Sequence, residues 1–293
     1  MWAVLNGEFV RKEEERIRLE DRGLTFGDGL FEVLRTVNGR LLFFDEHIER
    51  MVSSAEHFGF PLPWRPEEVE QQALELIRRN GIKDGECYLQ LTRGADRNRG
   101  HKYPPTDTAP TFFILAFPLR RIDPANWERG AKLFTYPDLR HQLCTHKTLN
   151  LLPNVMAKNH AYDRGGYEAL MFREDEHGRY VTEGGSSSYF CVADGRILVP
   201  EVDNILPGIT RGKIIRMAKN LGHEVEERRL YLSDLLAADE VLLTSTISKV
   251  MPVRAVDDAR FAAPGKITEL LQATYERLFR QQLGLQPPSG AIP

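Results

Sequence analysis

The chain has 293 residues, enough for one large domain or two ordinary ones. Hydrophobic residues make up 42% of it and charged residues 28%, which is typical of a soluble globular protein. The formal net charge of −3 argues against a nucleic-acid-binding protein, whose affinity would depend on a cationic surface. No apolar run approaches the roughly 20 residues needed to cross a bilayer, so we expect no membrane span.

The N-terminus and the cysteines indicate a cytoplasmic protein. Residues 1–8 lack the charged-then-apolar layout of a signal peptide. Cys87, Cys144 and Cys191 are widely spaced and odd in number, so they imply no disulfide framework.

The first part of the chain predicts strands and helices in separate blocks, which is typical of an α+β domain. Strand-like runs lie at residues 2–5, 9–10, 30–37, 41–44, 87–92 and 111–117. The turn Asn38-Gly39 predicts a hairpin between two of these runs. Asp45 is a candidate N-cap for a helix that runs to Phe58, and a second helical pattern covers 67–80.

A polar stretch after Pro118 predicts a boundary between two domains. We expect a small N-terminal α/β domain over 1–118, a linker over 119–128 and a larger sheet-based domain with flanking helices over 129–293. In the second part, strands are expected at 132–136, 168–172, 188–192, 196–199 and 240–244, and helices at 151–164, 210–221 and 267–283. The tail over 286–290 is expected to be loose.

Lys147 stands in a short polar stretch before the apolar residues Leu151 and Leu152, which we expect to enter the core. A lysine beside buried surface loses solvation, which frees its amine for Schiff-base chemistry. The alternative is a solvated lysine at a helix start.

Glu183 opens the run Gly184-Gly185-Ser186-Ser187-Ser188 after a strand-like Tyr180-Val181. A carboxylate followed by small hydroxyl residues can line a polar pocket, and it could keep the nitrogen of a pyridine ring protonated. The alternative is an exposed glutamate in a flexible turn.

Three further features could bind a phosphate. Gly208, Ile209 and Thr210 open a helix whose first backbone N–H groups suit an anion, although Thr210 could equally be a simple N-cap. The hydroxyl cluster 244–248 could add a contact. His47 and Arg50 share one helix face at i, i+3, and Arg50 can present two donors to a phosphate, unless both belong to a solvated face.

Signatures of other chemistries are missing. His141, Cys144 and His146 lack the CxxC or HExxH spacing of a zinc site, so we expect no metal. The sequence also contains no GxSxG, GxxxxGK or GxGxxG motif.

Taken together, these features resemble the class IV aminotransferases of pyridoxal-phosphate (PLP) fold type IV, and most of all the bacterial D-amino-acid aminotransferases. The resemblance extends from Leu5 to about Leu283 and includes the segments 20–33, 46–50, 147–150, 182–184, 208–211 and 244–246. It implies a two-domain PLP fold of the D-amino-acid aminotransferase type, a PLP cofactor, and a homodimer with active sites near the subunit boundary. It also implies that the first domain carries the substrate-recognition loop and the second binds PLP.

The resemblance also assigns roles to single residues. Lys147 matches the Schiff-base lysine, and Glu183 matches the partner of the pyridine nitrogen. The other cofactor positions are Arg50, Ile209, Thr210 and Thr246 for the phosphate, and Leu206 for one face of the ring. Arg99 and His101, in a loop over 93–104, match the Arg-x-His pair that binds the substrate α-carboxylate.

Three departures from the pattern keep the substrate open. Phe31 replaces the tyrosine of the D-specific members, and with Arg35 it is closer to the branched-chain L-amino-acid aminotransferases, which lack the Arg-x-His loop. Gly185 and Ser188 stand where serine and asparagine are usual. The favoured prediction is transfer from a D-amino acid to 2-oxoglutarate or pyruvate, with a donor range that could extend to (R)-primary amines. The alternatives are a branched-chain L-aminotransferase, a 4-amino-4-deoxychorismate lyase and a catalytically silent relative.

Overall fold

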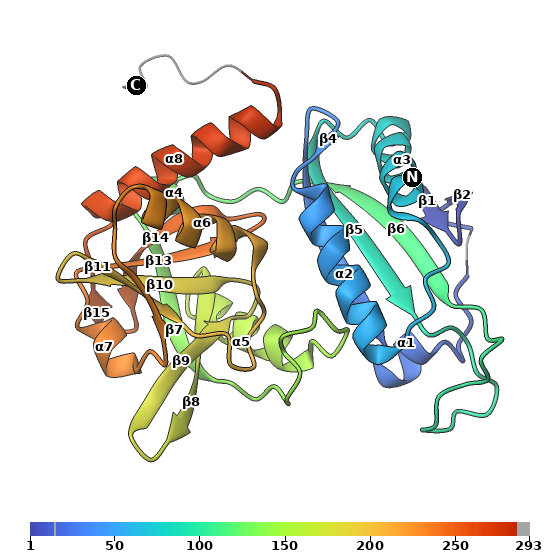
Figure 1. Cartoon of the computed structure of the whole chain (residues 1–293), viewed down its shortest axis with the longest axis horizontal. Coiled ribbons are helices and arrows are strands. Elements are labelled where there is room, and N and C mark those ends of the chain that lie inside the picture. Colours follow the sequence, from blue (N-terminus) through green and yellow to red (C-terminus); the bar gives the residue numbers. More distant parts are fainter. Residues whose placement is uncertain (15, 286–293) are drawn as a thin grey trace. The chain divides into compact units, whose positions relative to one another are not determined.

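The structure, a computed structural model, describes residues 1–14 and 16–285 (Figure 1). The predicted loose tail over 286–290 lies outside these residues. The chain divides into two compact units, the first made of Met1–Arg120 with His146–Asn150 and the second of Arg121–Thr145 with the chain from Leu151 onward. Helices and strands are both abundant, which confirms the predicted α+β class. The predicted domain bounds and the linker over 119–128 remain a prediction.

The first unit is built on one antiparallel sheet in the strand order β2-β1-β6-β5-β3-β4. Its elements are β1 (Trp2–Leu5), β2 (Glu8–Arg11), α1 (Arg22–Phe26), β3 (Gly29–Val37), β4 (Arg40–Leu41), α2 (Phe44–Phe58), α3 (Pro66–Arg79), β5 (Asp84–Thr92) and β6 (Thr111–Pro118). The hairpin predicted at Asn38-Gly39 is confirmed, since β3 and β4 pair on either side of it and both residues have positive φ angles of 50° and 74°.

The two faces of β3 have different surroundings because successive side chains of a strand point to opposite sides of the sheet. Leu30 and Leu34 are buried in one core with apolar side chains of α2 and α3. Glu32 shares their face of the strand and therefore points toward α2. Phe31 lies on the other face, where its ring stacks on that of Tyr88 from β5 at 5.7 Å.

The predicted N-cap of α2 is wrong by two residues. The helix begins at Phe44, and its N-cap is Phe43, which adopts a left-handed backbone (φ 54°) without a side-chain cap. Phe43 and Phe44 are both buried, so packing of these rings fixes the start of the helix. Asp45 lies in the first turn, where its negative charge still suits the helix dipole.

The second unit is built on a nine-stranded sheet, with the order β12-β11-β10-β13-β14-β7-β8-β9 and β15 paired to β14. Its elements are α4 (Ala125–Glu128), β7 (Ala131–Pro137), α5 (Leu152–Tyr162), β8 (Glu168–Asp175), β9 (Gly178–Gly184), β10 (Ser188–Ala193), β11 (Arg196–Pro200), α6 (Ile209–Asn220), β12 (Val225–Arg228), α7 (Leu232–Leu236), β13 (Glu240–Ser245), β14 (Lys249–Val256), β15 (Ala259–Arg260) and α8 (Lys266–Gln282). The five predicted strands and three predicted helices of this part are confirmed. The strands β12, β14 and β15 and the helices α4 and α7 were not predicted, and β9 was indicated only by the strand-like Tyr180-Val181.

The centre of this second sheet is fully buried. Tyr189 and Phe190 of β10 and Leu242 and Leu243 of β13 have no exposed surface. Central strands therefore hold β9 and the start of α6 on a rigid base. Across residues 1–14 and 16–285, no helix has both the length and the apolarity needed to span a membrane.

Candidate active site

Lys147 belongs to a short extended segment that pairs with the start of β3 in the first unit. The backbone N–H of Phe31 donates to the Lys147 carbonyl at 3.0 Å, and the N–H of Leu149 donates to Gly29 at 3.1 Å. Leu30 and Thr148 form an antiparallel bridge between these bonds. The backbone from the Lys147 carbonyl to Leu149 is therefore fixed to the start of β3.

The amine of Lys147 lies over an aromatic wall. Its Nζ is 4.3 Å from the centre of the Phe31 ring, within the range of a cation–π contact. Phe31 is only 8% exposed, and Tyr88 stacks behind it with its hydroxyl donating to Gln90 Oε1 at 2.6 Å. The Phe31 ring thus shields one side of this amine from water.

The expected cause of this desolvation is wrong. Leu152 does not enter the core of the second unit, since 71% of it is exposed, and it forms the first residue of α5. The apolar surface beside Lys147 comes instead from Phe31, which lies far away in the sequence.

A buried ionic cluster in the first unit contains both predicted residues of α2. Arg50 donates to both carboxylate oxygens of Glu32, from Nε at 2.7 Å and from Nη2 at 2.8 Å. His47 Nδ1 lies 2.7 Å from Glu32 Oε2, and the Glu32 side chain has no exposed surface. His47 and Arg50 do share one helix face, as predicted, and that face points inward to Glu32 rather than to solvent.

Charges within this cluster shift the ionisation of its members. Burial alone would raise the pKa of Glu32, but the Arg50 charge and the hydrogen bonds from His47 and Arg50 lower it to about 2. Burial lowers the pKa of His47 below its usual value of 6.5. Glu32 is therefore a permanent anion near neutral pH, and it orients the guanidinium of Arg50. No role was predicted for Glu32 from the sequence, because its partners lie 15 and 18 residues away.

The loop over 93–104 places Arg99 and His101 on either side of Gly100, both exposed. Both side chains contact the same ring, that of Phe26 at the end of α1. The structure thus brings these two predicted residues together.

Glu183 is buried at the end of β9 in the second unit, with 6% of it exposed. Its Oε1 accepts hydrogen bonds from Arg140 Nη1 and, at 3.1 Å, from the backbone N–H of Leu206. The predicted residues Glu183 and Leu206 are therefore neighbours. A buried carboxylate with these two donors is not the exposed glutamate of a flexible turn.

Arg140 connects Glu183 to a second buried carboxylate. Its Nε and Nη2 donate to the two oxygens of Asp138 at 2.9 and 2.8 Å. Arg173 adds a second cation 3.2 Å from Asp138. Burial would lower the pKa of Arg140, but its hydrogen bond to Asp138 and the charges of Glu183 and Asp138 raise it. Arg140 is thus a fixed positive charge, and no local pattern in the sequence marks it because its partner lies 43 residues away.

Hydroxyl groups gather at the start of α6. Gly208 is the N-cap of this helix, and Thr210 in its first turn is 3% exposed. Ser188 pairs with Thr244 across β10 and β13, and a Cβ on Gly208 would lie 3.0 Å from the Ser188 hydroxyl. The buried Thr244 hydroxyl has no hydrogen-bond partner in the part of the chain that the structure describes.

Two more predicted residues adjoin these hydroxyl groups along the chain. Ile209 is the first residue of α6, and Thr246 lies half-buried in the turn after β13. The first backbone N–H groups of a helix have no partner within it, so this start of α6 can receive an anion.

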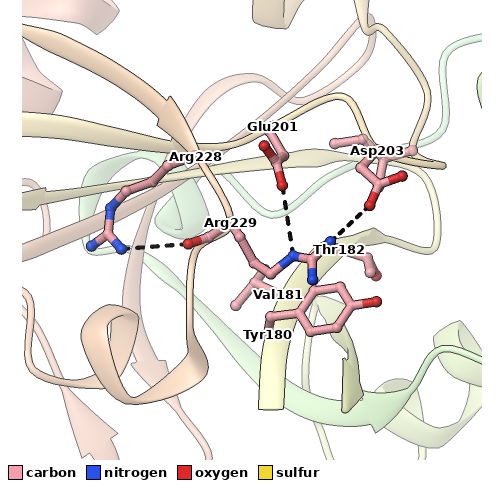
Figure 2. Close-up of a pocket in the computed structure, with 8 residues that line it drawn as sticks. Tyr180, Val181, Thr182, Glu201, Asp203, Arg228 and Arg229 are labelled. Carbon is pink, nitrogen blue, oxygen red and sulfur yellow. Dashed lines mark hydrogen bonds and ion pairs between the residues drawn. The ribbon is translucent and has the colours of Figure 1, made fainter. Parts of the chain in front are cut away.

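A separate hollow in the second unit contains none of the predicted site residues (Figure 2). Arg229 lines it and pairs with Asp203 at 3.0 Å and Glu201 at 3.6 Å, while its guanidinium lies 4.7 Å from the Tyr180 ring centre. These contacts hold the chain at 201–203, shortly before Leu206. The hollow is thus bordered by ion pairs of the loop that leads to α6.

Comparisons with known proteins find matches over most of the chain. Residues 29–256 match the model of the family "Amino-transferase class IV". The chain is 37% identical over 279 residues to a D-alanine aminotransferase of Staphylococcus epidermidis, an alignment that covers 94% of this chain and 96% of that protein.

Solved structures with the same fold include two kinds of enzyme. A branched-chain amino acid aminotransferase of T.th., with pyridoxamine 5'-phosphate, has a TM-score of 0.86 at 30% identity, covering 98% of this chain and 95% of that one. A 4-amino-4-deoxychorismate lyase of Pseudomonas aeruginosa has a TM-score of 0.81 at 28% identity, covering 96% and 99%.

Proposed function

This chain belongs to the class IV aminotransferases, which use PLP, and we propose that it moves the amino group of a D-amino acid to a 2-oxo acid. The observation that carries the substrate class is the similarity to D-alanine aminotransferases over nearly the whole chain. 2-Oxoglutarate and pyruvate are the expected acceptors.

The residues present suit PLP. A lysine amine, a buried carboxylate and a helix start with hydroxyl groups are the three partners that an aldehyde, a pyridine nitrogen and a phosphate require. The partnerless hydroxyl of Thr244 supports the phosphate assignment, because buried hydroxyl groups are normally hydrogen-bonded and a ligand oxygen would supply the missing partner. Nothing in the donor set favours a metal in its place.

Lys147 is the proposed attachment point and proton carrier. When bound, the cofactor supplies an aldehyde that links to amines and a ring that withdraws electrons from the substrate Cα. Lys147 Nζ would take the proton from that carbon. Phe31 shields one side of this amine from water.

Glu183 is the proposed partner of the pyridine nitrogen. Its carboxylate would accept the N–H of the ring and hold the proton on that nitrogen. Arg140 and the Leu206 amide fix the carboxylate in one orientation through its Oε1. Leu206 would cover one face of the ring.

Four residues are proposed to contact the phosphate: Arg50, Ile209, Thr210 and Thr246. The backbone at Ile209 and Thr210 would donate N–H groups at the start of α6, and the threonine hydroxyls would add to them. Arg50 would contribute a guanidinium that Glu32 holds in place.

Arg99 and His101 are proposed to bind the substrate α-carboxylate, since a guanidinium near an imidazole suits a carboxylate. Phe31 lacks the hydroxyl of the tyrosine that D-specific members have at this position. The loss of one neutral hydrogen bond weakens carboxylate binding by about 1 kcal/mol, which could widen the range toward (R)-primary amines.

One assay set tests this assignment against its alternatives. The purified PLP-loaded protein is mixed with 2-oxoglutarate and either D-alanine, L-leucine or (R)-1-phenylethylamine, and glutamate is measured. We expect D-alanine to react fastest, and Lys147→Ala to be inactive with each donor. Fastest reaction with L-leucine would favour a branched-chain aminotransferase. Pyruvate release from 4-amino-4-deoxychorismate without amino transfer would favour the lyase, and inertness toward every donor a silent relative.

We also propose a cytoplasmic homodimer. Leu152, Val155, Met156 and Tyr162 of α5 are between 44% and 78% exposed, an apolar row that a second copy of the chain could cover. All three cysteines are free thiols, as a reducing compartment requires. Sedimentation equilibrium tests the dimer: the wild type should have twice the monomer mass, and Val155→Glu should lower it.

A further inference from the structure

Phe26 is the common contact of three side chains in the first unit. The guanidinium carbons of Arg22 and Arg99 lie 4.7 and 4.8 Å from its ring centre, and the His101 ring centre lies 5.3 Å away at a tilt of 57°. Each distance falls within the range of an attractive cation–π or aromatic contact. Phe26 itself is half-buried and lies at the end of α1, outside the loop.

Arg22 fixes the backbone between the two loop residues. Its Nη1 donates to the Gly100 carbonyl at 2.8 Å, and its Nε donates to Asp28 at 2.8 Å. Its backbone N–H donates to Gly94 at 2.8 Å. The arginine is 3% exposed and therefore connects both the start and the tip of the loop to a rigid part of the first unit.

The backbone of Arg99 has an unusual conformation. Its φ of 32° lies in the left-handed region, which a residue with a long side chain seldom adopts without support. The bond from Arg22 to Gly100 and the contact of the Arg99 guanidinium with Phe26 supply that support. Arg99 and His101 flank Gly100, and both side chains contact the Phe26 ring.

We propose that Phe26 is a positioning residue for substrate recognition, holding the Arg99 guanidinium and the His101 imidazole together so that both can reach one carboxylate. It acts through these two side chains and does not touch the substrate. The proposal rests on the proposed function, in which Arg99 and His101 bind the α-carboxylate. Without the ring the two side chains would separate, and carboxylate affinity would fall while the chemistry at Lys147 continued.

The experiment compares Phe26→Leu with Phe26→Tyr in the PLP-loaded enzyme. Three quantities are measured: kcat and KM for D-alanine, the inhibition constant of propionate, which has a carboxylate but no amine, and the dissociation constant of PLP. For Phe26→Leu we expect KM and the propionate constant to rise about 5- to 10-fold, since two contacts are lost. The value of kcat and the PLP constant should stay within about twofold, because the ring is not placed at the cofactor, and Phe26→Tyr should resemble the wild type.

Phe9→Leu is the matched control, because Phe9 also carries a guanidinium, that of Arg79 at 3.9 Å, in the same unit. It should change none of the three quantities. Should Phe26→Leu not fold, Phe26→Met, which also lacks the ring, repeats the test. An unchanged propionate constant in the folded variant would overturn the proposal, as would an equal loss in PLP affinity.

Arg99→Gln separates this proposal from the function on which it rests. If Arg99→Gln weakens propionate binding but Phe26→Leu does not, Arg99 and His101 keep their proposed role and the role proposed for Phe26 is wrong. If neither substitution has an effect, or the wild type does not use D-alanine, the proposed substrate recognition fails as well.

Discussion

The ionic cluster of Glu32, His47 and Arg50 allows a quantitative prediction. In Glu32→Gln, the first unit loses a carboxylate that is fully buried and bonded to two partners. The pKa of Glu32 falls from its ordinary value of 4.5 to about 2 in the folded protein. Each pKa unit corresponds to about 1.4 kcal/mol, so the charged form contributes about 3 kcal/mol of stability at pH 7. This magnitude agrees with the cost of breaking a buried ion pair, about 3–5 kcal/mol.

The direction of the pH dependence follows from the lowered pKa. The stabilisation is fully present above pH 4.5, the unfolded value, and disappears as the pH falls through about 2. The difference between wild type and Glu32→Gln should therefore shrink from about 3 kcal/mol at pH 7 to about 1 kcal/mol at pH 3. His47 also makes the folded protein less stable as the pH falls below 6.5. Its pKa is lowered by burial, so the unfolded chain binds the proton more readily than the folded one.

The assay is urea unfolding followed by tryptophan fluorescence in a Trp127→Phe background. The remaining tryptophans, Trp2 and Trp64, both lie in the first unit and so report on it alone. Glu75→Gln is the control: the pKa of Glu75 is also lowered to about 2, through hydrogen bonds with Arg78 and Arg79. Because water screens those surface pairs, Glu75→Gln should lower the free energy of unfolding much less than Glu32→Gln does. Equal effects of the two substitutions, or a Glu32 effect that does not change with pH, would refute the reasoning.

Four further outcomes follow from the site. Lys147→Ala should abolish transamination while leaving the circular dichroism spectrum unchanged; residual turnover in a pure sample would contradict its role. Phe31→Tyr should lower the KM for D-alanine about fivefold by restoring one hydrogen bond of about 1 kcal/mol, and an unchanged KM would argue against a carboxylate there. Thr244→Val should weaken PLP binding, measured by fluorescence titration, yet should not destabilise the apoprotein, because its hydroxyl has no partner among the described residues. Arg140→Met should lower both the PLP affinity and the free energy of unfolding in urea, the latter by about 3 kcal/mol, because it leaves Asp138 and Glu183 without a shared cation. If neither quantity falls, the network contributes neither to cofactor binding nor to stability.

Features set by local chemistry could be predicted from the sequence. The Asn38-Gly39 hairpin follows from two adjacent residues that tolerate positive φ, and the helices α3 and α8 follow from apolar spacing within each segment. The strand β14 escaped prediction, and Pro252 in its middle obscures the pattern of a central strand. The start of α2 was misplaced because buried aromatic rings, rather than a capping side chain, determine it.

Contacts between distant parts of the chain could not be predicted. Glu32 meets Arg50 across 18 residues, Arg140 meets Glu183 across 43, and Phe31 reaches Lys147 only because residues 146–150 pair with β3. Family resemblance predicted roles for Lys147, Glu183 and the Arg99–His101 pair, but it predicted none for the side chains that contact them. The supporting residues Glu32, Arg140 and Phe26 become visible only when the folded chain brings them next to their partners.

The most direct test of the central claim is to reduce the PLP-loaded protein with borohydride and map the modified peptide by mass spectrometry. Reduction makes the link between the cofactor and its amine permanent. We expect a single phosphopyridoxyl group on the peptide that contains Lys147, and none in Lys147→Ala. Attachment at another lysine, or no attachment in protein that still transaminates, would contradict the account.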